Sequence, residues 1–155
     1  IGLASSGLHS NGFSLVRRVF SSAEQKKYAK ELLEPTRIYV KTILPLLEKF
    51  KIKGIAHLTG GAYYQKLSKI VPQGKCFKIK TGSWLVPPLF QEIQKKGRLP
   101  DKEMFTTFNM GIGMVLVVGL GESPLIREFL SKQGVENWVI GEVVGDRKKR
   151  IVFES

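Results

Sequence analysis

The amino-acid sequence predicts an α/β (α+β) domain, because segments with the apolar period of strands alternate along the chain with segments that have the period of helices. Glycine and proline stand where these segments end and turns begin. Neither an internal repeat nor a low-complexity linker interrupts the 155 residues, which suffice for one hydrophobic core. We therefore expect a single domain over residues 1–155.

The first elements are a strand over residues 1–5 and a helix over residues 12–20. Ser10 or Asn11 should be the N-cap of this helix, since either side chain can accept a hydrogen bond from the free amides of the first turn. The residues between this helix and the next apolar pattern are polar and receive no assignment.

A longer helix is expected over residues 36–50, where Pro45 should kink it by removing one amide from the helical ladder. Its apolar residues at helical spacing, which should face inward, are Tyr39, Ile43, Leu46, Leu47 and Phe50. Shorter patterns then predict a strand over residues 53–58, a helix over residues 63–70 and a strand over residues 75–80.

In the C-terminal half, a helix over residues 89–96 should end at Gly97, and Asp101 should cap a helix that ends near Phe108. The remaining expected elements are a strand over residues 114–118, a helix from Ser123 that ends before Gly134, and strands over residues 138–144 and 150–153. The last two strands flank a turn over residues 145–148 and should form a hairpin.

The composition favours anionic partners, because 25 Lys and Arg stand against 13 Asp and Glu, for a net charge of +12. Nucleotides, phosphorylated metabolites, nucleic acid and an acidic neighbouring domain all fit that charge. The lysines are scattered along the chain, as on a solvated surface, so we expect no specific nucleic-acid binding.

The single cysteine, Cys76, cannot form an intrachain disulfide, which suits a reducing cytoplasm and a small buried side chain. No apolar run approaches the roughly 20 residues of a membrane span, and no signal peptide is visible. The chain also opens without Met in apolar residues. We expect a cytoplasmic protein without a membrane partner, of which this chain is one piece.

Three loops place small residues between regular elements, where backbone amides are free to bind a ligand. They are residues 5–12, residues 57–62 and residues 109–113. The first runs into a helix N-terminus, which favours an anion, although a polar helix cap would have the same composition. Paired glycines in the second allow close approach of a ligand, but they also suit an ordinary tight turn. The third loop shares both interpretations.

Metal ligands are scarce. His9 and His57 have no cysteines at zinc-ligand spacing, and none of the three loops contains a carboxylate. The two aspartates, Asp101 and Asp146, lie in a predicted helix cap and a predicted turn. Magnesium on nucleotide phosphates needs carboxylates near the phosphate loop. We therefore expect no metal site in this chain alone.

Five segments, in order, resemble the C-terminal domain of the aminoimidazole ribonucleotide synthetase family, the phosphoribosylformylglycinamidine cyclo-ligases. They are Gly2–Arg17, Leu33–Tyr39, Ala56–Gly61, Phe108–Met114 and Trp138–Gly141, which contain the family's Ser-Ser-Gly-x-His-Ser-Asn-Gly, Pro-Thr-Arg-Ile-Tyr, His-x-Thr-Gly-Gly and Phe-Asn-x-Gly-x-Gly-Met patterns. One departure is Ala62, which replaces a third glycine and should require negative φ at that position.

This resemblance implies a layered α/β/α domain with a mixed sheet, partly ferredoxin-like. It also implies an ATP-dependent enzyme of de novo purine biosynthesis that converts formylglycinamidine ribonucleotide to aminoimidazole ribonucleotide. An N-terminal domain, absent here, would carry the Mg²⁺ ligands, much of the ATP site and the homodimer contact. The active site would lie between the two domains, and this chain alone should be inactive.

The residues that the resemblance and the loop chemistry assign to substrate and phosphate binding are Ser6, Gly7, His9, Ser10, Asn11, Gly12, Thr36, Arg37, Thr59, Gly60 and Gly61. His57 and Asn109 are further candidates, although His57 could instead satisfy a hydrogen bond in the core and Arg37 could be a surface residue in a helix's first turn. The catalytic residues stay unassigned.

Two alternatives to this function remain. One is another ATP-dependent member of the same superfamily, such as formylglycinamidine ribonucleotide synthetase, selenophosphate synthetase or thiamine-monophosphate kinase. The other is a basic nucleic-acid-binding α/β module, which would need aromatic and basic residues interleaved on an exposed sheet face.

Overall fold

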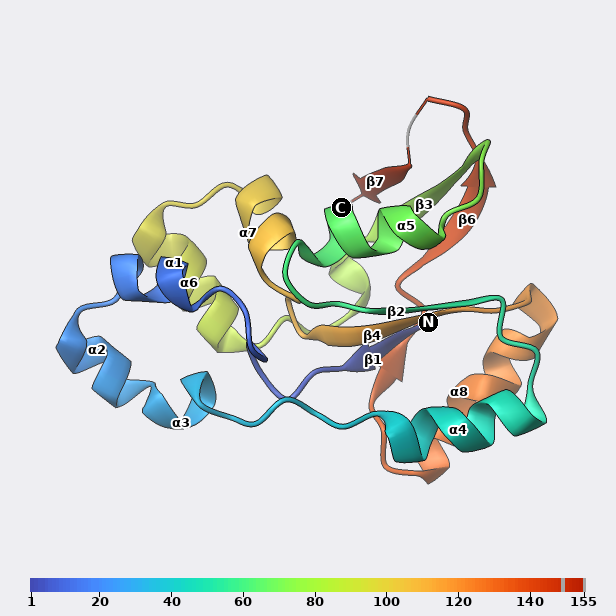
Figure 1. Ribbon diagram of the computed structural model, residues 1–155, viewed down its shortest axis with the longest axis horizontal. Coiled ribbons are helices and arrows are strands. Elements are labelled where there is room, and N and C mark those ends of the chain that lie inside the picture. The colour runs from blue at the N-terminus through green and yellow to red at the C-terminus, as the bar shows by residue number, and fades with distance from the viewer. Residues whose placement is uncertain (149, 155) are drawn as a thin grey trace.

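The computed structural model describes residues 1–148 and 150–154, and it divides their strands between two sheets (Figure 1). The first sheet has the order β2-β4-β1-β5, and all its neighbouring strands are antiparallel. Its strands are β1 (Gly2–Ala4), β2 (Gly54–His57), β4 (Ile112–Val117) and β5 (Asn137–Trp138).

Two crossing helices give this sheet its ferredoxin-like order. Helix α4 (Val40–Lys49) lies between β1 and β2 in the chain, and α8 (Ser123–Lys132) lies between β4 and β5. Each β-α-β unit therefore places a strand of the other unit between its own two strands, which is the split β-α-β arrangement. The predicted partly ferredoxin-like α+β fold is confirmed.

The second sheet has the order β6-β3-β7 and is the mixed one, because β3 is antiparallel to β6 and parallel to β7. Its strands are β3 (Lys75–Lys80), β6 (Gly141–Gly145) and β7 (Ile151–Glu154). The predicted C-terminal hairpin is wrong, since β6 and β7 pair with opposite edges of β3 rather than with each other. This arrangement gives the apolar centre of β3 a partner strand on both sides.

The expected strand over residues 138–144 is also two strands, because β5 ends at Trp138 in the first sheet and β6 begins at Gly141 in the second. A Cβ at Gly141 would lie 1.9 Å from the Lys78 carbonyl oxygen. Only glycine therefore lets β6 approach β3 at this register.

The remaining helices are short. They are α1 (Phe13–Val19), α2 (Ser22–Lys27), α3 (Ala29–Leu32), the π-helix η1 (Tyr63–Leu67), α5 (Ser68–Ile70), η2 (Thr81–Ser83), α6 (Pro88–Gly97), α7 (Asp101–Thr107) and η3 (Leu120–Glu122). Helices α2 and α3 fill the stretch that received no assignment. Ser21 and Glu24 form a capping box at the start of α2, a signal present in the sequence.

Two apolar clusters make the molecule layered. One lies between the first sheet and the helices α4 and α8, and includes Leu3, Leu46 and Ile126. The larger cluster joins the opposite face of that sheet to α1, α6, α7 and the second sheet. Figure 1 shows α4 and α8 together on one side of the sheet and the other helices beyond it. The α/β/α layering is thereby confirmed, and Cys76 is buried in β3 as expected.

Several helix ends differ from the prediction. Helix α4 begins at Val40, so the Thr36-Arg37 segment precedes it outside any helix or strand, and Leu47 is exposed rather than inward. Pro100 is the N-cap of α7 in place of Asp101, and Arg98, with φ of 49°, ends α6 in place of Gly97.

The N-cap of α1 is Gly12, with φ of 86° and no side-chain cap, so neither Ser10 nor Asn11 caps that helix. The Asn11 side chain is used elsewhere, since its Nδ2 donates to the Thr107 carbonyl. Among the residues that the structure describes, no helix has both the length and the apolar character of a membrane span.

Candidate functional site

The three loops chosen from the sequence meet at one end of the first sheet. Strands β1 and β2 run in the same direction and β4, between them, runs in the opposite one. The C-terminal ends of β1 and β2 and the N-terminal end of β4 therefore lie at the same end of the sheet. The Leu58 amide donates to the Gly113 carbonyl at 2.8 Å, and the Ser5 amide donates to the Gly111 carbonyl at 2.9 Å. Segments far apart in sequence thus form one site.

Asn109 joins two of these loops. Its Nδ2 donates to the Gly7 carbonyl at 2.8 Å, and its Oδ1 accepts from the Gly111 amide at 2.9 Å and from the Ser5 hydroxyl at 3.1 Å. The side chain is fully buried. Both ends of the amide are therefore engaged in holding the loops together, which is a structural role for this candidate.

His9 is strained and incompletely paired. Its backbone has φ of 63°, a conformation that costs a non-glycine residue roughly 1–2 kcal/mol. The Ser6 amide donates to Nε2 at 3.4 Å, which leaves the proton of the neutral ring on Nδ1. Within the described residues, the buried side-chain atoms that lack a hydrogen-bond partner are His9 Nδ1 and Asn11 Oδ1. Both lie in the first loop.

An aromatic cluster surrounds His9. The ring centroids of His9 and His57 are 5.9 Å apart, and the Tyr39 ring lies 6.4 Å from His9 and 5.8 Å from His57. The Tyr39 hydroxyl donates to the Ala4 carbonyl at 2.7 Å. A Cβ at Gly113 would lie 2.0 Å from that hydroxyl oxygen and 2.6 Å from His9 Cε1, so this glycine makes the room for both rings.

The charges at this cluster are positive. Burial, with smaller contributions from the neighbouring His57 and the Arg37 guanidinium, lowers the pKa of His9 to about 4. Burial also lowers the pKa of His57, with a contribution from the Lys66 ammonium. Both rings are therefore neutral at pH 7, beside two fixed cations. Such a place favours an anion that accepts hydrogen bonds.

The first loop and the Thr36-Arg37 segment meet beside this cluster. The Ser6 hydroxyl donates to the Pro35 carbonyl at 2.6 Å, which connects the first loop to the Thr36-Arg37 segment. Ser10 is exposed, while Thr36 and Arg37 are half-buried. His57 is exposed, so it does not satisfy a hydrogen bond in the core.

The second loop continues from His57 through Thr59, Gly60 and Gly61, and Gly61 has φ of 80°. Gly60 has open space around its Cα, whereas a Cβ at Gly61 would meet the Gln65 side chain. Ala62 has φ of 34°, so the expectation of negative φ is wrong. Ala62 therefore has a positive φ of the kind that glycine adopts easily, and this conformation is strained for a residue with a Cβ.

Sequence reasoning missed three members of the site. Tyr39 was expected only as an inward residue of a helix, Lys66 as part of a helical segment, and Gly113 only as the last residue of the third loop. The Tyr39 position closes the Pro-Thr-Arg-Ile-Tyr pattern, which was a usable signal. The sequence around Lys66 contains no such signal, because the closeness of Lys66 to His57 depends on how β2 meets η1.

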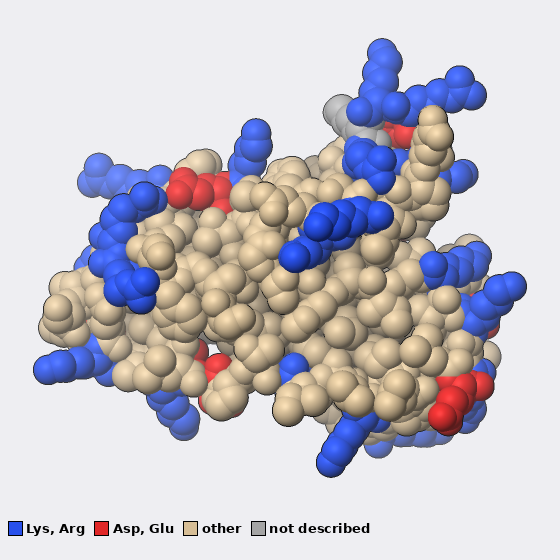
Figure 2. All heavy atoms as spheres, viewed as in Figure 1, with Lys and Arg blue, Asp and Glu red and all other residues tan. Residues whose placement is uncertain are grey.

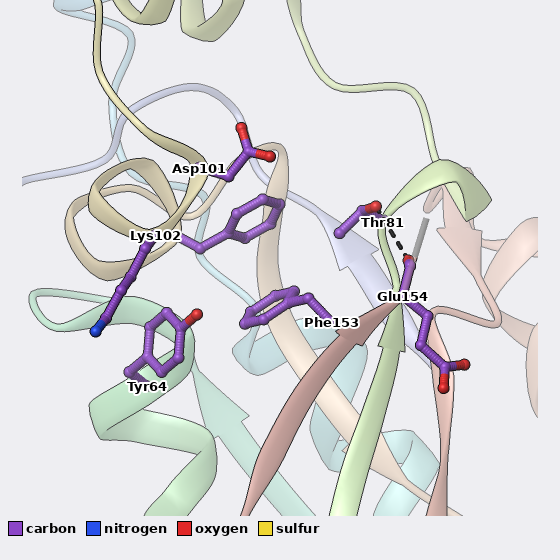
Figure 3. A pocket seen from close by; sticks show the side chains of 7 residues that line it. Tyr64, Thr81, Asp101, Lys102, Phe153 and Glu154 are labelled. Atoms are coloured by element: carbon purple, nitrogen blue, oxygen red, sulfur yellow. Dashed lines mark hydrogen bonds between the residues drawn. The ribbon is translucent and has the colours of Figure 1, made fainter.

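A separate pocket of about 180 Å³ lies between α7, η1 and the edge strand β7 (Figure 3). Aromatic rings of Tyr64, Phe105 and Phe153 line it, and Asp101 and Glu154 add carboxylates at its rim. The Thr81 hydroxyl donates to the Glu154 carbonyl at 3.1 Å, shown as a dashed line. None of the predicted phosphate-binding residues lines this pocket.

Magnesium does not fit the three loops. Their side chains offer imidazole, hydroxyl and amide groups beside cations, whereas Mg²⁺ prefers carboxylate oxygens. Over residues 1–148 and 150–154, no three His, Cys, Asp or Glu side chains gather as a metal site would require. On the face drawn in Figure 2, Lys and Arg outnumber Asp and Glu and are spread around the molecule.

Several known proteins have sequences similar to that of this chain. A phosphoribosylformylglycinamidine cyclo-ligase of Caldicellulosiruptor saccharolyticus is 47% identical over 92% of this chain and 46% of the relative. One of Pseudothermotoga lettingae is 47% identical over 98% of this chain and 48% of the relative. One of Alkaliphilus metalliredigens is 42% identical over 100% of this chain and 48% of the relative. The chain thus spans about half the length of these relatives.

The family comparison covers almost every residue. Residues 1–154 match the family described as AIR synthase related protein, C-terminal domain. The match extends over both sheets and over all three loops of the candidate site. The chain therefore belongs to the AIR synthase related protein family, as its C-terminal domain.

Proposed function

We propose that this chain is the substrate-binding half of an ATP-dependent phosphoribosylformylglycinamidine cyclo-ligase of purine biosynthesis. In this reaction ATP activates the formyl oxygen of formylglycinamidine ribonucleotide, an internal nitrogen closes the imidazole ring, and ADP and phosphate leave. The relatives' names and the family match support this function over the other superfamily members and over a nucleic-acid-binding module.

The observation that carries the proposal is the unsatisfied polarity of the first loop. Buried polar groups are almost always paired, and an orphaned one costs about 1–3 kcal/mol. His9 Nδ1 and Asn11 Oδ1 both lack partners among the described residues, and the His9 backbone is strained. Strain, an orphaned donor and an orphaned acceptor in one loop are typical of a site that a ligand completes.

The ligand that fits is a phosphorylated ribonucleotide. Arg37 and Lys66 supply positive charge, the neutral His9 ring supplies an N–H donor, and Ser10 supplies an exposed hydroxyl. Thr36 adjoins Arg37, and Thr59, Gly60 and Gly61 follow His57 in the chain. Neutral imidazoles donate hydrogen bonds without surrendering a proton to the phosphate, so they orient the substrate.

The other properties of the enzyme would reside outside this chain. ATP is the second substrate, and Mg²⁺ would neutralise its phosphates when bound. Because the loops lack carboxylates, we assign the Mg²⁺ ligands, the remainder of the ATP site and the homodimer contact to the other half of the polypeptide. The isolated chain would then be inactive, and the whole enzyme cytoplasmic.

Replacing the matched segment of the Caldicellulosiruptor saccharolyticus enzyme by this chain should give a hybrid that makes aminoimidazole ribonucleotide. In this hybrid, Ser10→Ala should raise the KM for the phosphorylated substrate about tenfold, since a hydrogen bond to a charged group contributes about 1.5–3 kcal/mol. Stability should change by less than about 0.5 kcal/mol, because Ser10 is exposed and caps no helix.

Ser14→Ala is the matched control, since Ser14 is equally a solvent-exposed serine but lies on α1. Its KM should equal that of the unsubstituted hybrid. A folded hybrid that forms no product would contradict the proposed function. Equal KM values for the two serine variants would remove Ser10 from the substrate site.

A further inference from the structure

The third loop is a firm support, because hydrogen bonds from core side chains hold its backbone. The buried hydroxyl of Tyr63 donates to the Asn109 carbonyl at 3.0 Å, and the indole Nε1 of Trp84 donates to the Met110 carbonyl at 2.8 Å. Both rings belong to the larger apolar cluster, and they stack with centroids 6.4 Å apart. Buried hydrogen bonds that are fully made rigidify the backbone they join. The third loop is therefore able to position a neighbouring loop.

The Asn109 side chain extends from this support to the peptide groups just before His9. Its Nδ2 donates to the Gly7 carbonyl at 2.8 Å and to the Leu8 carbonyl at 3.3 Å. The Leu8 carbonyl lies in the planar peptide group whose rotation relative to the Cα of His9 defines φ of that residue. Asn109 therefore restrains the backbone angle at His9 as well as the distance between the two loops.

The angle that Asn109 restrains is unfavourable for a residue with a side chain. His9 has φ of 63°, in the left-handed region where a Cβ crowds the backbone. Such a conformation persists only where the surrounding structure holds it. Without the two hydrogen bonds from Asn109, the backbone of His9 would be free to relax to negative φ, and the imidazole would turn with it.

The place of the His9 ring depends on this backbone angle. The ring is buried beside Tyr39, in room that exists because Gly113 has no side chain. Only in this place does the Ser6 amide reach Nε2, at 3.4 Å, and leave the ring proton on the unpaired Nδ1. The strained backbone thus determines both the position of the ring and the direction of its free N–H.

We propose that Asn109 is a positioning residue, which holds His9 in its left-handed conformation so that Nδ1–H is directed at the substrate phosphate. The proposal rests on the proposed function only for the identity of that anion. Asn109 itself contacts no substrate, since both ends of its side-chain amide are engaged within the protein. Loss of this amide therefore changes the geometry of His9 without removing a group that binds the anion.

NMR of the imidazole rings in the 155-residue chain tests the positioning without requiring activity. The chain has two histidines, so the resonances of each are readily assigned. In Asn109→Ala, the His9 ring should leave its buried place, and its pKa should rise from about 4 toward 6.5. The ring nitrogen signals should also show both neutral tautomers in place of Nδ1–H alone, because the Ser6 amide no longer holds Nε2.

Asn137→Ala is the matched control for a purely structural role. Asn137 is also a buried asparagine, whose Nδ2 donates to the Val135 carbonyl at 3.0 Å and whose Oδ1 accepts from Arg127 Nε at 3.1 Å. Its partners lie in α8 and in the segment that joins α8 to β5, outside the three loops. Asn137→Ala should lower stability, as the loss of buried hydrogen bonds does, but leave the pKa and the tautomer of His9 unchanged.

A second variant, Asn109→Ser, keeps one hydrogen-bonding group at this position and should shift the His9 signals in the same direction. A folded Asn109 variant with an unchanged His9 ring would overturn the proposal. If neither variant folded, Asn109 would support the fold as a whole, and the proposal would also be wrong.

Kinetics of the hybrid enzyme connect the positioning to the substrate. Asn109→Ala should raise the KM for formylglycinamidine ribonucleotide about tenfold, as the loss of one hydrogen bond to a charged group does, and should change the KM for ATP less than about twofold. Equal KM values for Asn109→Ala and Asn137→Ala would overturn the proposal. A folded hybrid that forms no product would contradict only the proposed function, because the NMR result on the chain decides the positioning by itself.

Discussion

Gly12→Ala is expected to destabilise the chain by roughly 2–5 kcal/mol, through two separate effects. Gly12 has φ of 86° at the N-cap of α1, where an alanine costs about 1–2 kcal/mol in backbone energy. The new Cβ would also lie 2.2 Å from Cε1 of Phe108, which is fully buried in the larger apolar cluster. Displacing a buried ring costs a further ~1–3 kcal/mol. Urea denaturation of the purified chain measures the sum.

Two other glycines separate the effects. Gly134 has φ of 70° and open space around its Cα, so Gly134→Ala should show the backbone cost alone. Gly121 has neither a positive φ nor a neighbour within 4 Å, so Gly121→Ala should change stability little. If Gly12→Ala cost no more than Gly134→Ala, Phe108 would not hold the first loop against the core.

The stability of the chain beginning at Ile1 is expected to rise by about 2 kcal/mol between pH 6 and pH 8 because of its α-amine. Burial, with a smaller contribution from the charge of Arg127, lowers the pKa of this amine from 8.0 to about 6. The nitrogen donates to the Leu116 carbonyl at 2.8 Å at the edge of the first sheet. As pH falls from 8 to 6, the unfolded chain binds a proton that the folded chain excludes, so stability is lost.

The control is the same chain with an acetylated N-terminus. Its amide still donates to Leu116, but it carries no titrating charge. The free energy of unfolding of the acetylated chain should therefore exceed that of the free chain at pH 6, and the two should converge above pH 8. The difference also removes the contribution of His9, which titrates in both forms. Parallel pH profiles would show that the Ile1 amine is solvated in the folded state.

The sequence predicted correctly those strands in which apolar residues recur at the spacing of a strand. Residues 75–80 form β3 with the expected limits, and residues 54–57 form β2 inside the expected range. Pairing depends on distant residues, and there the prediction failed. Nothing local to β6 and β7 shows that β3 lies between them. Adjacency in sequence favoured a hairpin of β6 with β7. In the structure, each of these strands instead forms backbone hydrogen bonds with one edge of β3.

The site was predictable in composition but not in arrangement. Hydroxyls, glycines and histidines identified the loops, and their meeting follows only from the strand directions of the first sheet. The capping residue was misassigned because Ser10 and Asn11 have the right chemistry, whereas close packing on Phe108 requires glycine at position 12. Tyr39 has an ordinary apolar pattern in sequence, and only the tertiary contacts place its ring beside both histidines.

The central claim is that the histidine cluster receives the phosphate of a ribonucleotide, and NMR titration of the imidazole resonances tests it most directly. Without ligand, His9 should titrate with a pKa of about 4, and the pKa of His57 should lie below its ordinary value. Saturating formylglycinamidine ribonucleotide should raise both pKa values, because a bound anion favours the charged ring. The unphosphorylated nucleoside should not. If both pKa values stayed unchanged while resonances shifted only at the pocket of Tyr64 and Phe153, the phosphate would bind elsewhere and the claim would be wrong.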